Sequence, residues 1–141
     1  MNKFFIKISL VFTMLSFVAC AERGIDIVNL RCDYMESPLG IDNLNPVLQW
    51  QLISEGTGKS QSAYRIIVSD DLSLIKRGQG DYWDSGKVLS SESIVRYQGK
   101  KLSARMQLYW KVMVWYECDV PSEWSNIADW SMGLPYPSDW K

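Results

Sequence analysis

The strongest constraint on the fold is the alternating stretch at residues 108–115, which reads LYWKVMVW. If this stretch is a β-strand, its side chains point to two opposite faces with a period of two. The inner face would then carry Leu108, Trp110, Val112 and Val114. The outer face would carry Tyr109, Lys111, Met113 and Trp115. The inner set is typical of a core and the outer set of a half-covered surface, so we expect a central strand of an antiparallel sandwich.

The rest of the chain repeats this period in short runs that are separated by Gly, Pro, Asn and Ser. Besides 108–115, the expected strands are residues 27–34, 47–53, 63–69, 81–83 with a continuation at 87–89, 93–97 and 126–132. In the first of them we place Val28, Leu30 and Cys32 on one face. Residues 70–80 could add one helical turn. Turn signals at intervals of about 8–12 residues predict an all-β, antiparallel immunoglobulin-like or fibronectin type III-like β-sandwich of about seven strands.

Composition excludes several classes of function. The 141 residues include no His, and the net charge is -1. Without His, Ser-His-Asp and Cys-His catalysis and the common His-ligated metal sites are excluded. A near-neutral chain also gives no basis for binding phosphate backbones, which requires a clustered basic surface. We therefore expect no cofactor, no metal and no nucleic acid.

The first 20 residues have the pattern of a secretory signal peptide. Lys3 and Lys7 precede an apolar run at residues 8–19, which is shorter than the roughly 20 residues that span a bilayer. We therefore expect an exported chain.

The end of that run indicates how the chain is processed. Phe17-Val18-Ala19-Cys20 resembles a bacterial lipobox, in which the Cys is lipidated and becomes the mature N-terminus, although Phe17 replaces the usual Leu. Ordinary cleavage after Ala21 is the alternative. We expect a lipid anchor at Cys20 that holds the chain in the cell envelope, or else a periplasmic or secreted protein. Residues 21–26 would be a tether.

Six stretches are informative as an ordered set. They are LRCDYMESPLGIDNLNPVLQW at 30–50, QSAYRIIVSD at 61–70, GDYWDSGKV at 80–88, YWKVMVW at 109–115, PSEWS at 121–125 and MGLPYPSDWK at 132–141. Together they resemble the N-terminal fibronectin type III-like module of bacterial α-L-rhamnosidases. The resemblance covers nearly all of the chain after the tether. It implies a sandwich over residues 27–134, with residues 135–141 beginning a linker to a following module that this chain lacks.

The same resemblance implies a function. In that family the module precedes further β modules and an (α/α) barrel that carries the catalytic carboxylates, so no catalytic residue maps onto this chain. We expect a non-catalytic accessory module of an exported α-L-rhamnosidase-like glycoside hydrolase, whose partners are the downstream modules of the same enzyme. The alternative is an independent carbohydrate-binding or adhesion module at the bacterial cell surface, which could bind a rhamnose-containing polysaccharide.

One position departs from the fibronectin pattern. Such sandwiches commonly place a Tyr near the start of the strand that corresponds to residues 108–115, and its hydroxyl bonds back to a loop. Leu108 occupies that place, so we expect this hydrogen bond to be missing and Leu108 to lie in the core. A register that gave the role to Tyr109 would put Lys111 in the core, which is costly.

No set of residues predicts catalysis. Glycoside hydrolysis needs two carboxylates about 5–9.5 Å apart. The candidate cluster is Asp70, Asp71, Asp81 and Asp84. All four lie at expected turns, where capping and solvation explain them. Ser85 has no His as a base, and the GTGKS sequence at 56–60 lacks the upstream Gly and the following helix of a phosphate loop.

The PSEWS sequence at 121–125 resembles half of the W-S-x-W-S motif of cytokine-receptor sandwiches, in which a Trp stacks with basic side chains of the neighbouring strand. We expect Trp124 to stack with Lys111 and Arg65 through cation–π contacts. With the outer face at 109–115, Trp124 would complete an interaction surface.

Surface aromatic side chains could also contact carbohydrate. Our candidates are Trp83, Trp115, Trp130 and Tyr136. Large exposed apolar patches usually mark an interface. We expect the remainder of the enzyme, rather than a sugar, to cover the surface that these aromatic side chains form.

Overall fold

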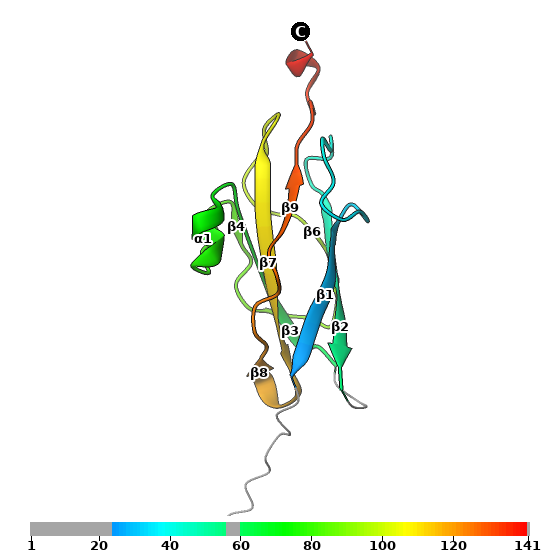
Figure 1. The fold of residues 1–141 in the computed structure, drawn as a ribbon, viewed down its shortest axis with the longest axis vertical. Coiled ribbons are helices and arrows are strands. Elements are labelled where there is room, and N and C mark those ends of the chain that lie inside the picture. Colours follow the sequence, from blue (N-terminus) through cyan, green and yellow to red (C-terminus); the bar gives the residue numbers. More distant parts are fainter. Residues whose placement is uncertain (1–23, 56–59, 141) are drawn as a thin grey trace, which may run out of the picture.

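Two antiparallel β-sheets face each other in the computed structural model, which describes residues 24–55 and 60–140 (Figure 1). The smaller sheet has the order β1 (Ile25–Cys32), β2 (Val47–Ser54) and β6 (Ile94–Arg96). The predicted all-β, immunoglobulin-like sandwich is confirmed. The expectations for residues 1–20, including Cys20, and for the loop at 56–59 lie outside the described residues.

The larger sheet is built on two long strands, β3 (Ala63–Ser69) and β7 (Gln107–Tyr116), which pair along the whole length of β3. Its outer strands are β4 (Trp83–Asp84) and β5 (Val88–Leu89) beside β3, and β8 (Val120–Pro121) and β9 (Ala128–Ser131) beside β7. Three short helical segments connect or follow the strands: α1 (Leu72–Lys76), η1 (Glu117–Asp119) and η2 (Pro137–Asp139). Among the described residues, no helix has the length and apolar character needed to cross a membrane.

Strand β1 departs from simple alternation. It begins at Ile25, so the last two residues of the expected tether belong to the strand. Its pairing with β2 is interrupted between Val28 and Arg31, where Asn29 has a positive φ of 53°. Such a bulge reverses which side chains face inward. Ile27 therefore lies in the core in place of the predicted Val28, whereas Cys32, beyond the bulge, is buried as expected.

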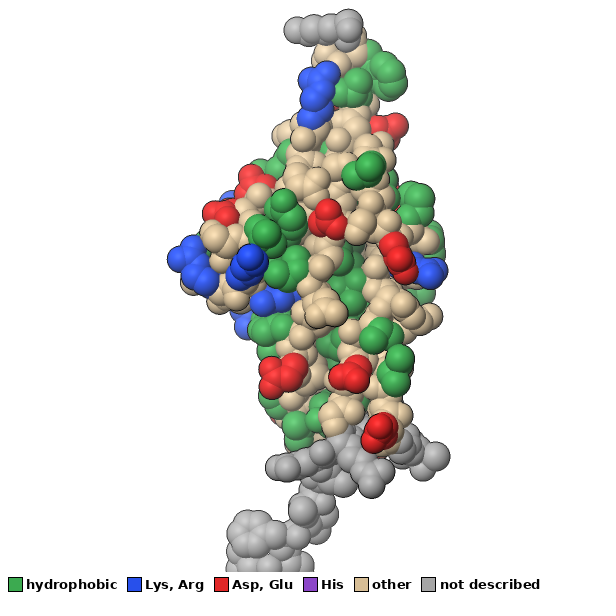
Figure 2. All heavy atoms as spheres, viewed as in Figure 1, with side chains coloured by type: hydrophobic (Ala, Val, Ile, Leu, Met, Phe, Trp, Pro, Cys, Tyr) green, Lys and Arg blue, Asp and Glu red, His purple; other side chains and the backbone are tan. Residues whose placement is uncertain are grey.

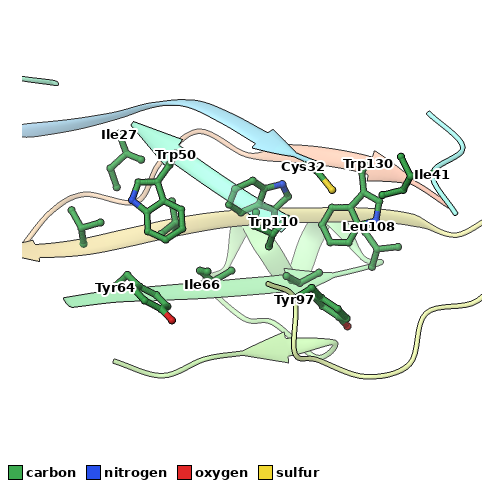
Figure 3. Close-up of a cluster of buried hydrophobic side chains, with 14 of the residues drawn as sticks. Ile27, Cys32, Ile41, Trp50, Tyr64, Ile66, Tyr97, Leu108, Trp110 and Trp130 are labelled. Carbon is green, nitrogen blue, oxygen red and sulfur yellow. The ribbon is translucent and has the colours of Figure 1, made fainter. Parts of the chain in front are cut away.

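The core between the sheets is rich in aromatic residues (Figure 3). Trp50 and Tyr64 meet edge to face with ring centroids 5.6 Å apart, and Tyr97 makes similar contacts with Trp83 and Trp130. The whole predicted inner face of β7 is buried, namely Leu108, Trp110, Val112 and Val114. Leu108 is thus a core residue, as expected. Aromatic pairs of this geometry add to the stabilisation that burial alone provides.

The buried Tyr97 hydroxyl predicts a loss of stability in alkali. It donates a 2.7 Å hydrogen bond to the Lys100 carbonyl, and burial raises its pKa above the ordinary value of 10.0. Above about pH 10 the unfolded chain releases a proton that the folded chain retains, so the free energy of unfolding falls as the pH rises. We expect Tyr97→Phe to flatten this decline in urea titrations at about pH 8 and pH 11. An equal decline in both proteins would contradict the assignment.

Candidate interaction surface

The outer face of β7 is partly covered by the chain itself. Strand β3 lies beside it, with Ile67 opposite Lys111 and Arg65 opposite Met113. Helix α1 packs on β3 and β7, and its Ile75 is fully buried, as is Ile67. Lys111, whose position on the outer face would otherwise be exposed to solvent, is therefore enclosed. Lys111 is only 7% exposed, and this burial lowers its pKa from the usual lysine value.

Trp124 lies against two cationic side chains at the centre of this surface. The Lys111 Nζ atom is 5.0 Å and the Arg65 Cζ atom 5.7 Å from the centroid of the Trp124 ring. Both predicted stacking partners are confirmed. A cation that has lost part of its hydration gains more from an aromatic face than an exposed one does. The indole ring thus replaces some of the water that Lys111 loses on burial.

The serines of the PSEWS segment hold Trp124 in place. The Ser125 hydroxyl accepts a hydrogen bond from the Val112 N–H, and the Ser122 hydroxyl accepts one from the Val114 N–H, each at 3.0 Å. The Ser122 and Ser125 N–H groups donate in return to the Val114 and Val112 carbonyls. The segment is therefore fixed along the edge of β7 through four hydrogen bonds, and Trp124, between the two serines, is directed over the sheet.

Trp115 lies further along β7 beside a shallow open hollow. The Lys87 Nζ atom is 4.9 Å from the centroid of its ring and also forms a 2.6 Å ion pair with Asp119. Arg65 and Asp84 form a two-pronged ion pair in which the distances are 3.0 Å and 2.7 Å. The hollow is lined by Arg65, Asp84, Ser85, Gly86, Lys87 and Trp115. The charged side chains of the hollow therefore already have partners, since Arg65 pairs with Asp84 and Lys87 pairs with Asp119 outside it.

Two of the four candidate carboxylates, Asp71 and Asp84, have structural roles. Hydrogen bonding to Arg65 is the main cause that lowers the pKa of Asp84. Asp71 caps α1 by accepting a 2.8 Å hydrogen bond from the Ser73 N–H, and its hydrogen bonds with Ser73 lower its pKa as well. A general acid in glycoside hydrolysis needs a raised pKa. Residues 24–55 and 60–140 also contain no group of three potential metal ligands.

The proposed carbohydrate contacts do not form one platform. Trp130 is fully buried, and its Nε1 donates to the Met132 sulfur at 3.4 Å, so its assignment as a surface contact is wrong. Trp83 is half-buried, with its ring directed edgewise at Tyr97. Tyr136 lies in the segment beyond β9, where Lys101 Nζ approaches its ring to 5.0 Å.

Sequence reasoning missed the partners that β4 and the loop after it contribute. Asp84 of β4 lies opposite Ile67 of β3 in the sheet. This register places Asp84 diagonally beside Arg65 on the outer face. Lys87 follows the turn at Gly86 and reaches Trp115. The alternation in Trp83-Asp84 was a usable signal, but a strand of two residues does not specify its register on its neighbour.

Comparisons with known proteins agree with this architecture. Residues 27–136 match the family model described as "Rha78A-like, N-terminal immunoglobulin domain". An α-L-rhamnosidase of Formosa agariphila is 38% identical over 120 residues, which are 84% of this chain but 13% of that protein. The chain thus spans about an eighth of the length of this relative.

Two solved structures show the same similarity. The α-L-rhamnosidase of Dictyoglumus thermophilum superimposes with a TM-score of 0.80 at 38% identity, over 82% of this chain and 13% of that one. The Streptomyces avermitilis α-L-rhamnosidase, solved with L-rhamnose, gives a TM-score of 0.79 at 35% identity, over 84% of this chain and 11% of that one. In both cases the similarity covers a small part of a much longer chain.

Proposed function

The chain belongs to the family of Rha78A-like N-terminal immunoglobulin domains, and on this premise we propose that it is the accessory module of an exported α-L-rhamnosidase, where it positions neighbouring modules. The observation that supports this most directly is coverage, because the match takes in most of this chain but only 13% of the Formosa agariphila enzyme. The chemistry of the surface agrees, since Asp71 caps helix α1 and Asp84 forms an ion pair with Arg65.

The proposal predicts that the chain alone does not hydrolyse glycosides. Purified protein incubated with a nitrophenyl α-L-rhamnoside should release no nitrophenol above the blank. A coding frame read beyond residue 141 should continue into further modules, and that longer protein should release nitrophenol from the same substrate. Release by the isolated chain would overturn the accessory role.

Export and anchoring form part of the same proposal. Lys3, Lys7 and the apolar run at 8–19 support a signal peptide, and Phe17-Val18-Ala19-Cys20 supports lipidation. Cells grown with a radioactive fatty acid should incorporate the label into the wild-type protein and not into the Cys20→Ala variant. If the wild-type protein were exported but carried no label, the lipid anchor would be ruled out and secretion without an anchor would take its place.

A second candidate function rests on the hollow beside Trp115. An aromatic face next to a carboxylate, a hydroxyl and a cation is a suitable site for a sugar ring. Affinity electrophoresis in a rhamnose-containing polysaccharide tests this reading. Retardation that is lost in Trp115→Ala would favour an independent carbohydrate-binding module. We expect no retardation, because Lys87 already stacks on Trp115 and the charges around it are paired.

A further inference from the structure

The segment beyond β9 leaves the sandwich in a fixed direction. Gly133 donates from its N–H to the Ile41 carbonyl at 2.8 Å, and its own carbonyl accepts from Arg105. Three residues further on, the Tyr136 hydroxyl donates to the Leu102 carbonyl at 3.3 Å. Asp139 closes the next turn by accepting from the Tyr136 N–H at 3.0 Å. The expected linker at 135–141 therefore begins in a segment, residues 133–136, that hydrogen bonds anchor to the sandwich.

The loop between β1 and β2 lies at the same end of the molecule and is also held firmly (Figure 1). Asp33 accepts a 2.8 Å hydrogen bond from the Val47 N–H, and Ser37 donates to Asp129 at 2.7 Å. Asp33, Tyr34 and Ser37 all have positive φ angles, which non-glycine residues adopt at a conformational cost. The hydrogen bonds impose this shape on the loop, so its side chains are presented in a defined arrangement.

Large apolar side chains are exposed on these two segments. We call this surface the distal end and define it by Tyr34, Met35, Leu39 and Trp140, which are 64%, 49%, 83% and 69% exposed. They are half of the eight exposed large hydrophobic residues in the described part of the chain. Figure 2 shows hydrophobic side chains near the end from which the C-terminal segment emerges. Apolar side chains on a preorganised loop are typical of an interface.

We propose that the distal end is the surface on which the module that follows in α-L-rhamnosidases packs. This inference rests on the proposed accessory role and names the contact through which it acts. The anchored exit at Gly133 and Tyr136 directs the chain past this surface, and Trp140 lies at the start of the connection. The hollow beside Trp115 is the less suitable dock, because its cations already have partners.

A chimera tests the assignment. Residues 24–140 replace the matching module of the Dictyoglumus thermophilum enzyme, and amide hydrogen exchange is compared between the chimera and the isolated chain. Hydrolysis of a nitrophenyl rhamnoside by the chimera reports that the rest of the enzyme is folded. We expect exchange in residues 33–40 and 137–140 to slow at least tenfold in the chimera, and exchange around Trp115 to stay unchanged.

Leu39 and Leu89 supply a matched pair of variants, because they are 83% and 81% exposed and lie on different parts of the surface. Leu39→Asp should abolish the slower exchange in the chimera and leave the melting temperature of the isolated chain unchanged. Leu89→Asp should leave both unchanged. Slower exchange at another surface would overturn the assignment of the distal end but keep the accessory role. Unchanged exchange everywhere would overturn both.

Discussion

Replacing Trp130 with alanine is expected to lower the free energy of unfolding by about 3–5 kcal/mol. Trp130 is fully buried between the sheets, 6.1 Å from the Tyr97 ring centroid in an edge-to-face contact. Alanine would leave a cavity that the surrounding strands can fill only in part, because packed interiors relax incompletely. It would also remove the hydrogen bond from the indole N–H to Met132.

Urea titration followed by far-UV circular dichroism measures this loss. Trp140→Ala is the matched control, because Trp140 is an exposed Trp of the same chain and its removal should change stability by less than about 0.5 kcal/mol. If Trp130→Ala were as stable as the control but lost binding to a polysaccharide, the residue would be a surface contact after all.

Trp124→Ala should cost about 2 kcal/mol. Two cation–π contacts, with Lys111 and Arg65, each contribute roughly 0.5–1 kcal/mol, and the half-buried indole adds the free energy of its own burial. The substitution would also leave Lys111 beside a space that the Trp124 ring had filled. Removing one partner of a buried charge is more costly than the contact alone suggests.

The neighbouring Glu123→Ala is the control for this variant, because its side chain is exposed and makes no hydrogen bond or ion pair among the described residues. Trp124→Phe keeps an aromatic face and should recover part of the loss. Equal unfolding midpoints for Trp124→Ala and wild type would show that the cation–π contacts contribute nothing measurable.

The central strands were predictable because their side chains alternate without interruption. Residues 63–69 form β3 with the expected bounds, and β7 extends the expected strand by one residue at each end. The bulge in β1 was not predictable, since Asn29 looks like any other polar residue of a strand. Bulges depend on how two strands meet, and a one-residue slip reverses every side chain beyond it.

The candidate surface was predictable where it depends on a long strand and not elsewhere. The positions of Lys111 and Arg65 follow from alternation on β7 and β3, which is why both were expected near Trp124. Lys87 and Asp84 come from short segments whose register only the folded chain reveals.

The wrong prediction for Trp130 has a different cause. The alternation of its strand places Trp130 with Ala128 and Met132 on an apolar face, and this pattern predicts burial rather than the surface position that we expected.

The hydrogen bonding of Ser122 and Ser125 to β7 has a consequence for solubility. One edge of this strand is occupied along its length, by β9 near its start, by the two serines at its middle and by β8 at its end. An edge with unpaired N–H and C=O groups can recruit a strand of another molecule and begin aggregation. Strand β7, which is long and largely apolar, therefore has both edges paired, and a strand of another molecule finds no free edge there even at high protein concentration.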